Sequence, residues 1–214
     1  MINVTTENIR IVLQSYERSA ERTVLKRDDL IHAAVLVPIV YGGDEPALLL
    51  TQRTERVETH KGHIAFPGGM VDPDDRDRTH TALREAEEEL GIPASAVEIC
   101  GVLDDLATPT GFVITPVVGL LRERPQIQRN EEEVADAFYV PLSFFADPSH
   151  AEHEFRQVGG TQREIWTYRY SGRVIWGATA AVIRRMMAVL TRPAPNPPEQ
   201  NAHPPDIPSR GHIP

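Results

Sequence analysis

Residues 84–92 read Arg-Glu-Ala-Glu-Glu-Glu-Leu-Gly-Ile, and the glycine pair Gly68-Gly69 precedes them. Within this stretch Glu85, Glu88 and Glu89 stand at positions i, i+3 and i+4, so a helix places all three on one face. Like charges at this spacing repel one another and weaken an isolated helix. A divalent cation that prefers oxygen ligands, Mg²⁺ or Mn²⁺, would neutralise them. The stretch therefore predicts a helix with a metal site on its acidic face.

The charge of the whole chain points in the same direction. The formal net charge is −9, which disfavours nonspecific binding to nucleic acid. An acidic protein also repels a polyanionic substrate unless metal ions and local basic side chains reverse the field at the site. A merely solvated acidic face is the competing interpretation of the three glutamates. The glycine pair upstream, and Gly91 at the position where the helix should stop, favour the metal site over it.

The stretch resembles the Nudix box, whose core reads Arg-Glu-U-x-Glu-Glu-x-Gly-U, where U is a bulky apolar residue. The matching residues are Gly69, Arg84, Glu85, Glu88, Glu89, Gly91 and Ile92. Ala86 is a smaller side chain at the first apolar position. Asp75 stands where the box has its first glutamate, and one extra residue separates it from Arg84. The resemblance implies the Nudix fold, an α/β/α sandwich with a mixed sheet.

A second motif lies upstream and is similar to the signature of the coenzyme A pyrophosphatases within the Nudix superfamily. It comprises residues 49–53 (Leu-Leu-Thr-Gln-Arg), Gly62 and residues 66–69 (Phe-Pro-Gly-Gly). Thr54 stands where that family has Ser or Ala, and Glu58 stands where it has Arg. An extra residue inside the box is also common in the coenzyme A pyrophosphatase family. The resemblance to that family extends over most of the chain.

This resemblance implies metal-dependent hydrolysis of the diphosphate bond of coenzyme A and its derivatives, giving 3′,5′-ADP and 4′-phosphopantetheine or its acyl form. Two alternatives stay open. Glu58 keeps open a Nudix hydrolase of ADP-ribose or another nucleoside diphosphate derivative, because a carboxylate there would repel coenzyme A phosphates. A non-catalytic nucleotide-binding Nudix domain is the other, although such a domain has no need of three aligned glutamates. The implied partner is a small-molecule diphosphate, with no nucleic acid and no membrane.

Hydrolysis of a diphosphate needs a water molecule that is activated as a nucleophile and a positive charge that neutralises the phosphoryl oxygens. The sequence offers candidate residues for both tasks. The predicted metal ligands are Glu85, Glu88, Glu89 and, from the resemblance, the backbone carbonyl of Gly69. The candidates for the general base are Glu85 and Glu133, between which the sequence does not choose. Arg84 is predicted to hold the neighbouring carboxylates in place.

Substrate binding is assigned to the segment that precedes the box. Arg53 is predicted to clamp a phosphate, because a guanidinium suits that geometry; a surface ion pair is the competing interpretation. The resemblance adds Gly62, Phe66 and Gly68 to the predicted substrate-binding set. His60 and His63 flank the first of these glycines, and we interpret them as ordinary loop or strand residues rather than as substrate contacts.

Hydrophobic periodicity and turn residues divide the chain into many strands and few helices, which indicates an α+β fold. Helices are predicted over residues 5–24, 79–90 and 178–190. Strands are predicted over residues 31–41, 47–51, 63–66, 97–105, 112–121, 135–140, 164–170 and 173–176. Thr6 is the expected cap of the first helix, and Ser171-Gly172 is the expected turn between the last two strands.

A chain of 214 residues suits one main domain. We expect a helical extension over residues 1–30, a Nudix hydrolase domain over 31–191 and a disordered tail over 192–214, where eight of the 18 prolines lie. Cys100 is the only cysteine and reads as a buried strand residue. The lack of a disulfide framework, a signal peptide and a long apolar run predicts a cytoplasmic protein. The sequence leaves the oligomeric state open.

Overall fold

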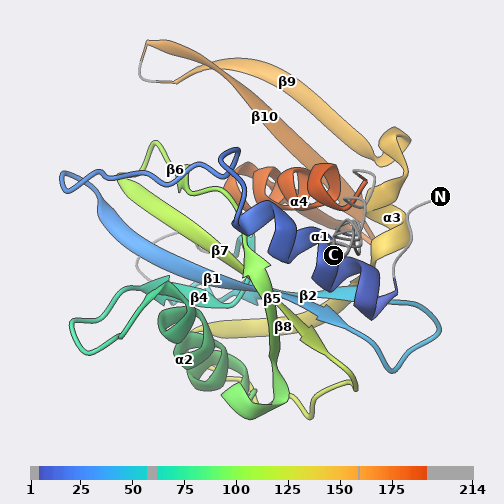
Figure 1. The fold of residues 1–214 in the computed structure, drawn as a ribbon. Helices are drawn as coiled ribbons and strands as arrows, with labels where there is room; N and C mark the ends of the chain where they lie inside the picture. The colour runs from blue at the N-terminus through green and yellow to red at the C-terminus, as the bar shows by residue number, and fades with distance from the viewer. Residues whose placement is uncertain (1–4, 57–61, 159, 192–214) are drawn as a thin grey trace, which may run out of the picture.

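The structure is a computed structural model, and it describes residues 5–56, 62–158 and 160–191 (Figure 1). Three predictions from the sequence, on Glu58, on His60 and on the tail 192–214, lie outside the described residues. Two sheets and the helices packed on them make up the described part of the chain.

The main sheet is mixed and has eight strands. They are β1 (Ile31–Val40), β2 (Ala47–Arg53), β3 (Ile64–Ala65), β4 (Gly68–Met70), β5 (Glu98–Val102), β6 (Leu106–Ala107), β7 (Phe112–Leu121) and β8 (Val134–Pro141). The order is β3-β2-β1-β7-β5, with β4 also on β1, β6 on β7 and β8 on β2. β1 and β7 run parallel along their whole length, from Ile31 opposite Phe112 to Val40 opposite Leu121. Both are rich in Val, Ile and Leu, as strands buried on two faces are.

A smaller antiparallel sheet follows and contains β9 (Ala151–Val158), β10 (Thr161–Tyr170) and β11 (Arg173–Trp176). The predicted hairpin between β10 and β11 is confirmed: Ser171 has φ +47° and Gly172 has φ +77°, the left-handed pair that two-residue hairpin turns use. The sequence did not predict β9, because Phe155 is the only apolar residue among residues 152–157 and the segment shows no apolar alternation. In Figure 1 the hairpin of β9 and β10 extends away from the body of the molecule.

Helices cover both faces of the main sheet, which confirms the predicted α/β/α sandwich (Figure 1). The helices are α1 (Thr6–Glu17), α2 (Arg78–Leu90), α3 (Leu142–Ala146) and α4 (Gly177–Leu190), with short 3₁₀ turns η1 (Ala94–Ala96) and η2 (Pro148–His150). α2 packs Ala82 and Ala86 on one face of the sheet, and α1 and α4 pack on the other. Among the described residues, no helix has both the length and the apolar composition needed to span a bilayer.

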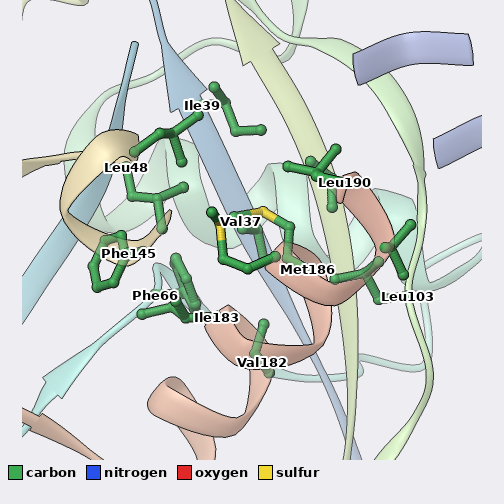
Figure 2. Close-up of a cluster of buried hydrophobic side chains, with 14 of the residues drawn as sticks. Val37, Ile39, Leu48, Phe66, Leu103, Phe145, Val182, Ile183, Met186 and Leu190 are labelled. Atoms are coloured by element: carbon green, nitrogen blue, oxygen red, sulfur yellow. The ribbon is translucent and has the colours of Figure 1, made fainter. Parts of the chain in front are cut away.

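The larger core lies between the sheet and α4 (Figure 2). From the sheet side it includes Val37, Ile39 and Leu48, and from α4 it includes Ile183 and Met186, all of them completely buried. This packing fixes the position of the sheet edge that carries β2 and β3, since both the edge and α4 share one continuous apolar layer.

The predicted boundaries that are wrong include those of the first helix and of the strand over 97–105. The first helix ends at Glu17 rather than at residue 24, because its buried stripe stops at Tyr16, and its cap is Thr5 rather than Thr6: the Thr5 hydroxyl accepts from the Asn8 N–H at 3.3 Å. The strand predicted over 97–105 ends at Val102. Beyond it, the Asp104 carboxylate accepts from the Thr23 N–H at 2.8 Å, so the chain there serves the α1–β1 connection instead of the sheet.

The interpretation of Cys100 is confirmed. It lies in β5 with 1% of its surface exposed. Burial raises the pKa of the Cys100 thiol to about 12, so the thiol stays protonated and unreactive at neutral pH.

Candidate active site

The acidic helix α2 is fixed at both ends by local signals. The Asp77 carboxylate caps its N-terminus by accepting from the His80 N–H at 2.8 Å. Gly91 ends it in the left-handed conformation, with φ +67°, where its N–H reaches the carbonyls of Ala86 and Glu87. The small buried residues Ala82 and Ala86 let the helix lie close to the sheet, so its carboxylates stand directly beside β4.

Gly69 in β4 lies against the first of these carboxylates. A Cβ atom on Gly69 would meet three atoms of the Glu85 carboxyl group within 2.7 Å, so a larger residue there would push Glu85 away. β4 is held in place by antiparallel pairing with β1, in which Gly69 faces Ala34. The backbone of Gly69 and the Glu85 carboxylate, which the sequence grouped together, are therefore neighbours.

Arg84 is the centre of a network of hydrogen bonds that joins α2 to the preceding loop. Its Nη1 donates to Glu85 at 2.9 Å and to Glu88 at 3.0 Å. Its Nη2 donates to the Met70 carbonyl at 3.1 Å and to Asp75 at 3.0 Å, while Nε donates to the other Asp75 oxygen at 3.1 Å. This bidentate pair lowers the pKa of Asp75, because Arg84 stabilises its charged form.

Asp75 is thus the partner of Arg84, at the position where the box has its first glutamate. Its side chain is only 1% exposed, and it also contacts the His80 ring, whose Nδ1 lies 2.8 Å from Oδ1. Sequence reasoning noted Asp75 but missed His80. The signal was present in the cap, since Asp77 fixes the first turn of α2 and so brings His80 back over Asp75.

Glu89 is the most buried carboxylate of the group, with 3% of the residue exposed. Its Oε1 lies 3.7 Å from the Arg53 Nη1 at the end of β2. Neither Glu89 Oε2 nor Arg53 Nε has a hydrogen-bond partner in the described part of the chain. Burial raises the pKa of Glu89 to about 8, and the nearby charges of Glu85 and Glu133 act in the same direction against the effect of Arg53.

The alternative interpretation of Arg53 as a surface ion pair is wrong, because the pair with Glu89 is largely buried, with the two side chains 23% and 4% exposed.

Burial also raises the pKa of Glu85, with Arg84 opposing the shift. Glu133 lies close enough for its charge to raise the pKa of both Glu85 and Glu89. It immediately precedes β8, its carbonyl accepts from the Thr54 N–H at 2.9 Å, and its carboxylate accepts from the Asn130 amide at 3.2 Å.

The structure does not gather all predicted residues into one set. Glu88 points outward, with its side chain 57% exposed and held by Arg84. Phe66 is 4% exposed and packs in the core below α4 (Figure 2), so its side chain faces away from the carboxylates. Gly62 lines a separate cavity with His63, and Gly68 pairs with Val35 of β1, beside Gly69. The aromatic side chain of Phe66 therefore packs in the core rather than forming the predicted substrate contact.

No group of three or more His, Cys, Asp or Glu side chains is arranged to hold a metal ion among the residues that the structure describes. Arg84 holds Glu85 and Glu88, whereas Glu89 faces Arg53, so the three carboxylates do not converge. The donors nevertheless fit a hard divalent cation. Glu89 offers a buried oxygen without a partner, and desolvation disfavours the charge of both Glu85 and Glu89, which a cation would stabilise.

We expect Arg84→Lys to lower the free energy of unfolding by about 2 kcal/mol. Lysine keeps the charge but cannot reproduce the fork that holds the buried Asp75 together with Glu85. Urea unfolding checks this, with Arg122→Lys as the matched control, because Arg122 pairs with Glu98 on the exposed surface. Equal losses in the two variants would show that the Arg84 network adds no more stability than a surface pair.

The NUDIX domain family model matches residues 30–158 of the chain. A protein of Yersinia enterocolitica described as an uncharacterized Nudix hydrolase NudL is 46% identical over 155 residues, which are 72% of this chain and 79% of that protein. The NudL of Photorhabdus laumondii is 42% identical over 159 residues, 74% of this chain and 84% of the relative. The crystal structure of a NUDIX hydrolase from Alicyclobacillus acidocaldarius aligns with a TM-score of 0.50 and 19% identity, covering 75% of this chain and 92% of that one.

Proposed function

The chain belongs to the NUDIX domain family and is a Nudix hydrolase, and from this premise we propose that it cleaves the diphosphate bond of coenzyme A and its derivatives. The products would be 3′,5′-ADP and 4′-phosphopantetheine or its acyl form. One observation carries the choice of substrate. The first part of the segment that is similar to the coenzyme A pyrophosphatase signature, residues 49–53, ends in Arg53, whose guanidinium lies 3.7 Å from Glu89 of the box helix. The signature and the acidic helix thus meet at one place.

Nudix hydrolases generally use divalent metals such as Mg²⁺ or Mn²⁺. In this proposal Glu85 and Glu89 would hold the cation together with the backbone carbonyl of Gly69, and Glu88 would join them through a change of side-chain position. The cation would act as a Lewis acid and neutralise charge on the phosphoryl oxygens. Arg84 would keep the Glu85 carboxylate oriented through its bond at 2.9 Å, as it does in the structure.

The general base is Glu85 or Glu133, and each has one supporting observation. Burial raises the pKa of Glu85, which makes its carboxylate a stronger acceptor for a proton. Glu133 is held by the Asn130 amide at 3.2 Å and stands close enough to raise the pKa of both Glu85 and Glu89. Either carboxylate would take the proton from the attacking water.

Arg53 would hold a substrate phosphate. Its Nε is buried without a hydrogen-bond partner in the described part of the chain, and its Nη1 is only weakly engaged at 3.7 Å from Glu89. A guanidinium with spare donors suits bidentate recognition of phosphate. Gly62 and Gly68 belong to the same segment and would shape the substrate-binding surface by their backbones. The domain division and the cytoplasmic location expected from the sequence are further parts of the proposal.

The proposal predicts which products form. Incubation of the protein with coenzyme A and Mg²⁺ or Mn²⁺ should give 3′,5′-ADP and 4′-phosphopantetheine, identified by their masses. The control is the same reaction with a chelator, which should stop it. Efficient cleavage of ADP-ribose without cleavage of coenzyme A would replace the proposed substrate by the second candidate. Absence of hydrolysis across a panel of diphosphates at all metal concentrations would instead favour a non-catalytic nucleotide-binding domain.

A further inference from the structure

The recess lined by Gly62 and His63 lies at the edge of the main sheet, where the β10–β11 turn meets β3. It is a cavity of about 400 Å³, a size that can hold a nucleoside. Its principal side chains are Gln52, His63, Arg173, Val174 and Trp176. Three of these come from β11, beyond residues 30–158 that the family model matches. The C-terminal part of the chain therefore forms this wall of the cavity.

The cavity lies next to the proposed catalytic groups without sharing them. Gln52 and Arg53 are consecutive at the end of β2, where the pairing with β8 shifts its register, and their side chains face different groups. Arg53 points toward Glu89, and Gln52 lines the cavity. β3 is only two residues long and pairs Ile64 with Gln52, so the sheet ends here. A molecule bound at Arg53 would have to pass this short edge to enter the cavity.

An aromatic corner forms one side of the cavity. The rings of Trp176 and His63 lie 5.0 Å apart with an angle of 62° between their planes. Trp176 is 42% exposed although it is a large apolar residue. Its backbone is fixed on both sides, because it ends β11 and directly precedes α4, which is tied to β3 by the Thr179 hydroxyl donating to the Ile64 carbonyl at 3.0 Å. A rigid, exposed indole beside a second ring suits a flat aromatic ligand.

Polar side chains also line the cavity. Arg173 donates to Asp136 at 2.6 Å and lies over the Phe138 ring, 4.3 Å from its centroid. These contacts hold the guanidinium in one orientation, so it is a fixed wall and not a mobile cation. The Gln52 amide supplies both a donor and an acceptor. A heterocycle with donors and acceptors along its edge matches this combination better than an aliphatic chain does.

We propose that this cavity binds the purine ring at the nucleotide end of the diphosphate substrate, stacked on Trp176 and hydrogen-bonded at its edge by Gln52. The inference rests on the proposed function, because it takes the diphosphate to lie near Arg53. A purine is separated from its diphosphate by one ribose, and the proposed phosphate contact and the cavity involve two consecutive residues of β2, Arg53 and Gln52.

Binding of AMP to the full-length protein, measured by calorimetry, tests the inference. Trp176→Ala should weaken AMP binding about tenfold, as the loss of one base–aromatic stack does, and Trp176→Phe should retain most of it. Phe155→Ala is the matched control, since Phe155 is an exposed aromatic residue of the same sheet outside the cavity. In a Trp166→Phe variant the remaining indole is Trp176, and its fluorescence should change on addition of AMP but not of ribose 5-phosphate.

Unchanged AMP affinity in Trp176→Ala, with a melting temperature that shows a folded protein, would overturn the inference. Equal affinity for ribose 5-phosphate and AMP would do the same. The outcome is separable from that of the proposed function. If coenzyme A is cleaved and Trp176→Ala leaves its KM unchanged, the cavity assignment fails and the function stands. If coenzyme A is not cleaved but AMP binding depends on Trp176, the function fails and the cavity assignment stands.

Discussion

Replacing Glu85 or Glu89 by Gln should reduce diphosphate hydrolysis by about a hundredfold or more while the protein stays folded. Gln keeps the size of each side chain but removes the negative charge that would hold a divalent cation. Both residues occupy constrained positions, Glu85 against the backbone of Gly69 and Glu89 beside Arg53 in the interior.

Steady-state rates at several metal concentrations measure this effect. The matched control is Glu87→Gln on the same helix, because Glu87 is exposed and contributes no side-chain contact to the carboxylate group. It removes one negative charge from α2, so it accounts for any general change in the charge of the helix. Near-normal activity of Glu85→Gln or Glu89→Gln, or of the unaltered protein with excess chelator, would contradict the proposed metal site.

The same Glu89→Gln substitution should stabilise the metal-free protein at alkaline pH. The pKa of Glu89 is about 8, against an ordinary value of 4.5, because burial disfavours its charge. The folded state therefore binds a proton more tightly than the unfolded state between these two values. Stability from Glu89 is fully present below pH 4.5, falls as the pH rises, and is lost above about pH 8. The full change is on the order of a few kcal/mol.

Glutamine resembles protonated glutamate at every pH. The free energy of unfolding of the Glu89→Gln variant should therefore lack the fall with rising pH that Glu89 causes. Urea unfolding in the presence of EDTA, from pH 5.5 to 8, should show the unaltered protein losing stability relative to Glu89→Gln. Other groups that titrate in this range are common to both proteins, so the difference between the two curves isolates Glu89. Parallel curves would show that Glu89 is charged throughout the range and that its burial is compensated by Arg53.

Taken together, the two predictions give Glu89 opposite effects on activity and stability. The charged Glu89 carboxylate, buried beside Glu85 and Glu133, destabilises the folded state of the metal-free protein. The same charge would stabilise a bound cation. A loss of activity accompanied by a loss of stability at pH 8 would indicate a structural role for Glu89 instead.

The sequence alone was sufficient for features that depend on neighbouring residues. The helix predicted over 79–90 is observed as Arg78–Leu90, and the strand predicted over 112–121 has the same bounds in the structure. Both follow from periodicity and from local caps, such as Gly91, that act within one turn of the chain. The Nudix box was also readable, because its residues lie in one helix and the loop before it. The sequence did not predict polar strands such as β9, because such a segment becomes a strand through pairing with its partner and not through its own residue pattern.

Only the tertiary structure decided how these residues are used. It buried Glu89 beside Arg53 and left Glu88 exposed, although the helical spacing treats the two alike. It turned Phe66 into the core, where the motif had suggested a substrate contact. It also joined His63 to Trp176, residues more than a hundred positions apart, in one cavity. The desolvation of a side chain and its contacts with residues distant in the sequence depend on which surfaces pack together in the fold. No local pattern of side chains contains that information.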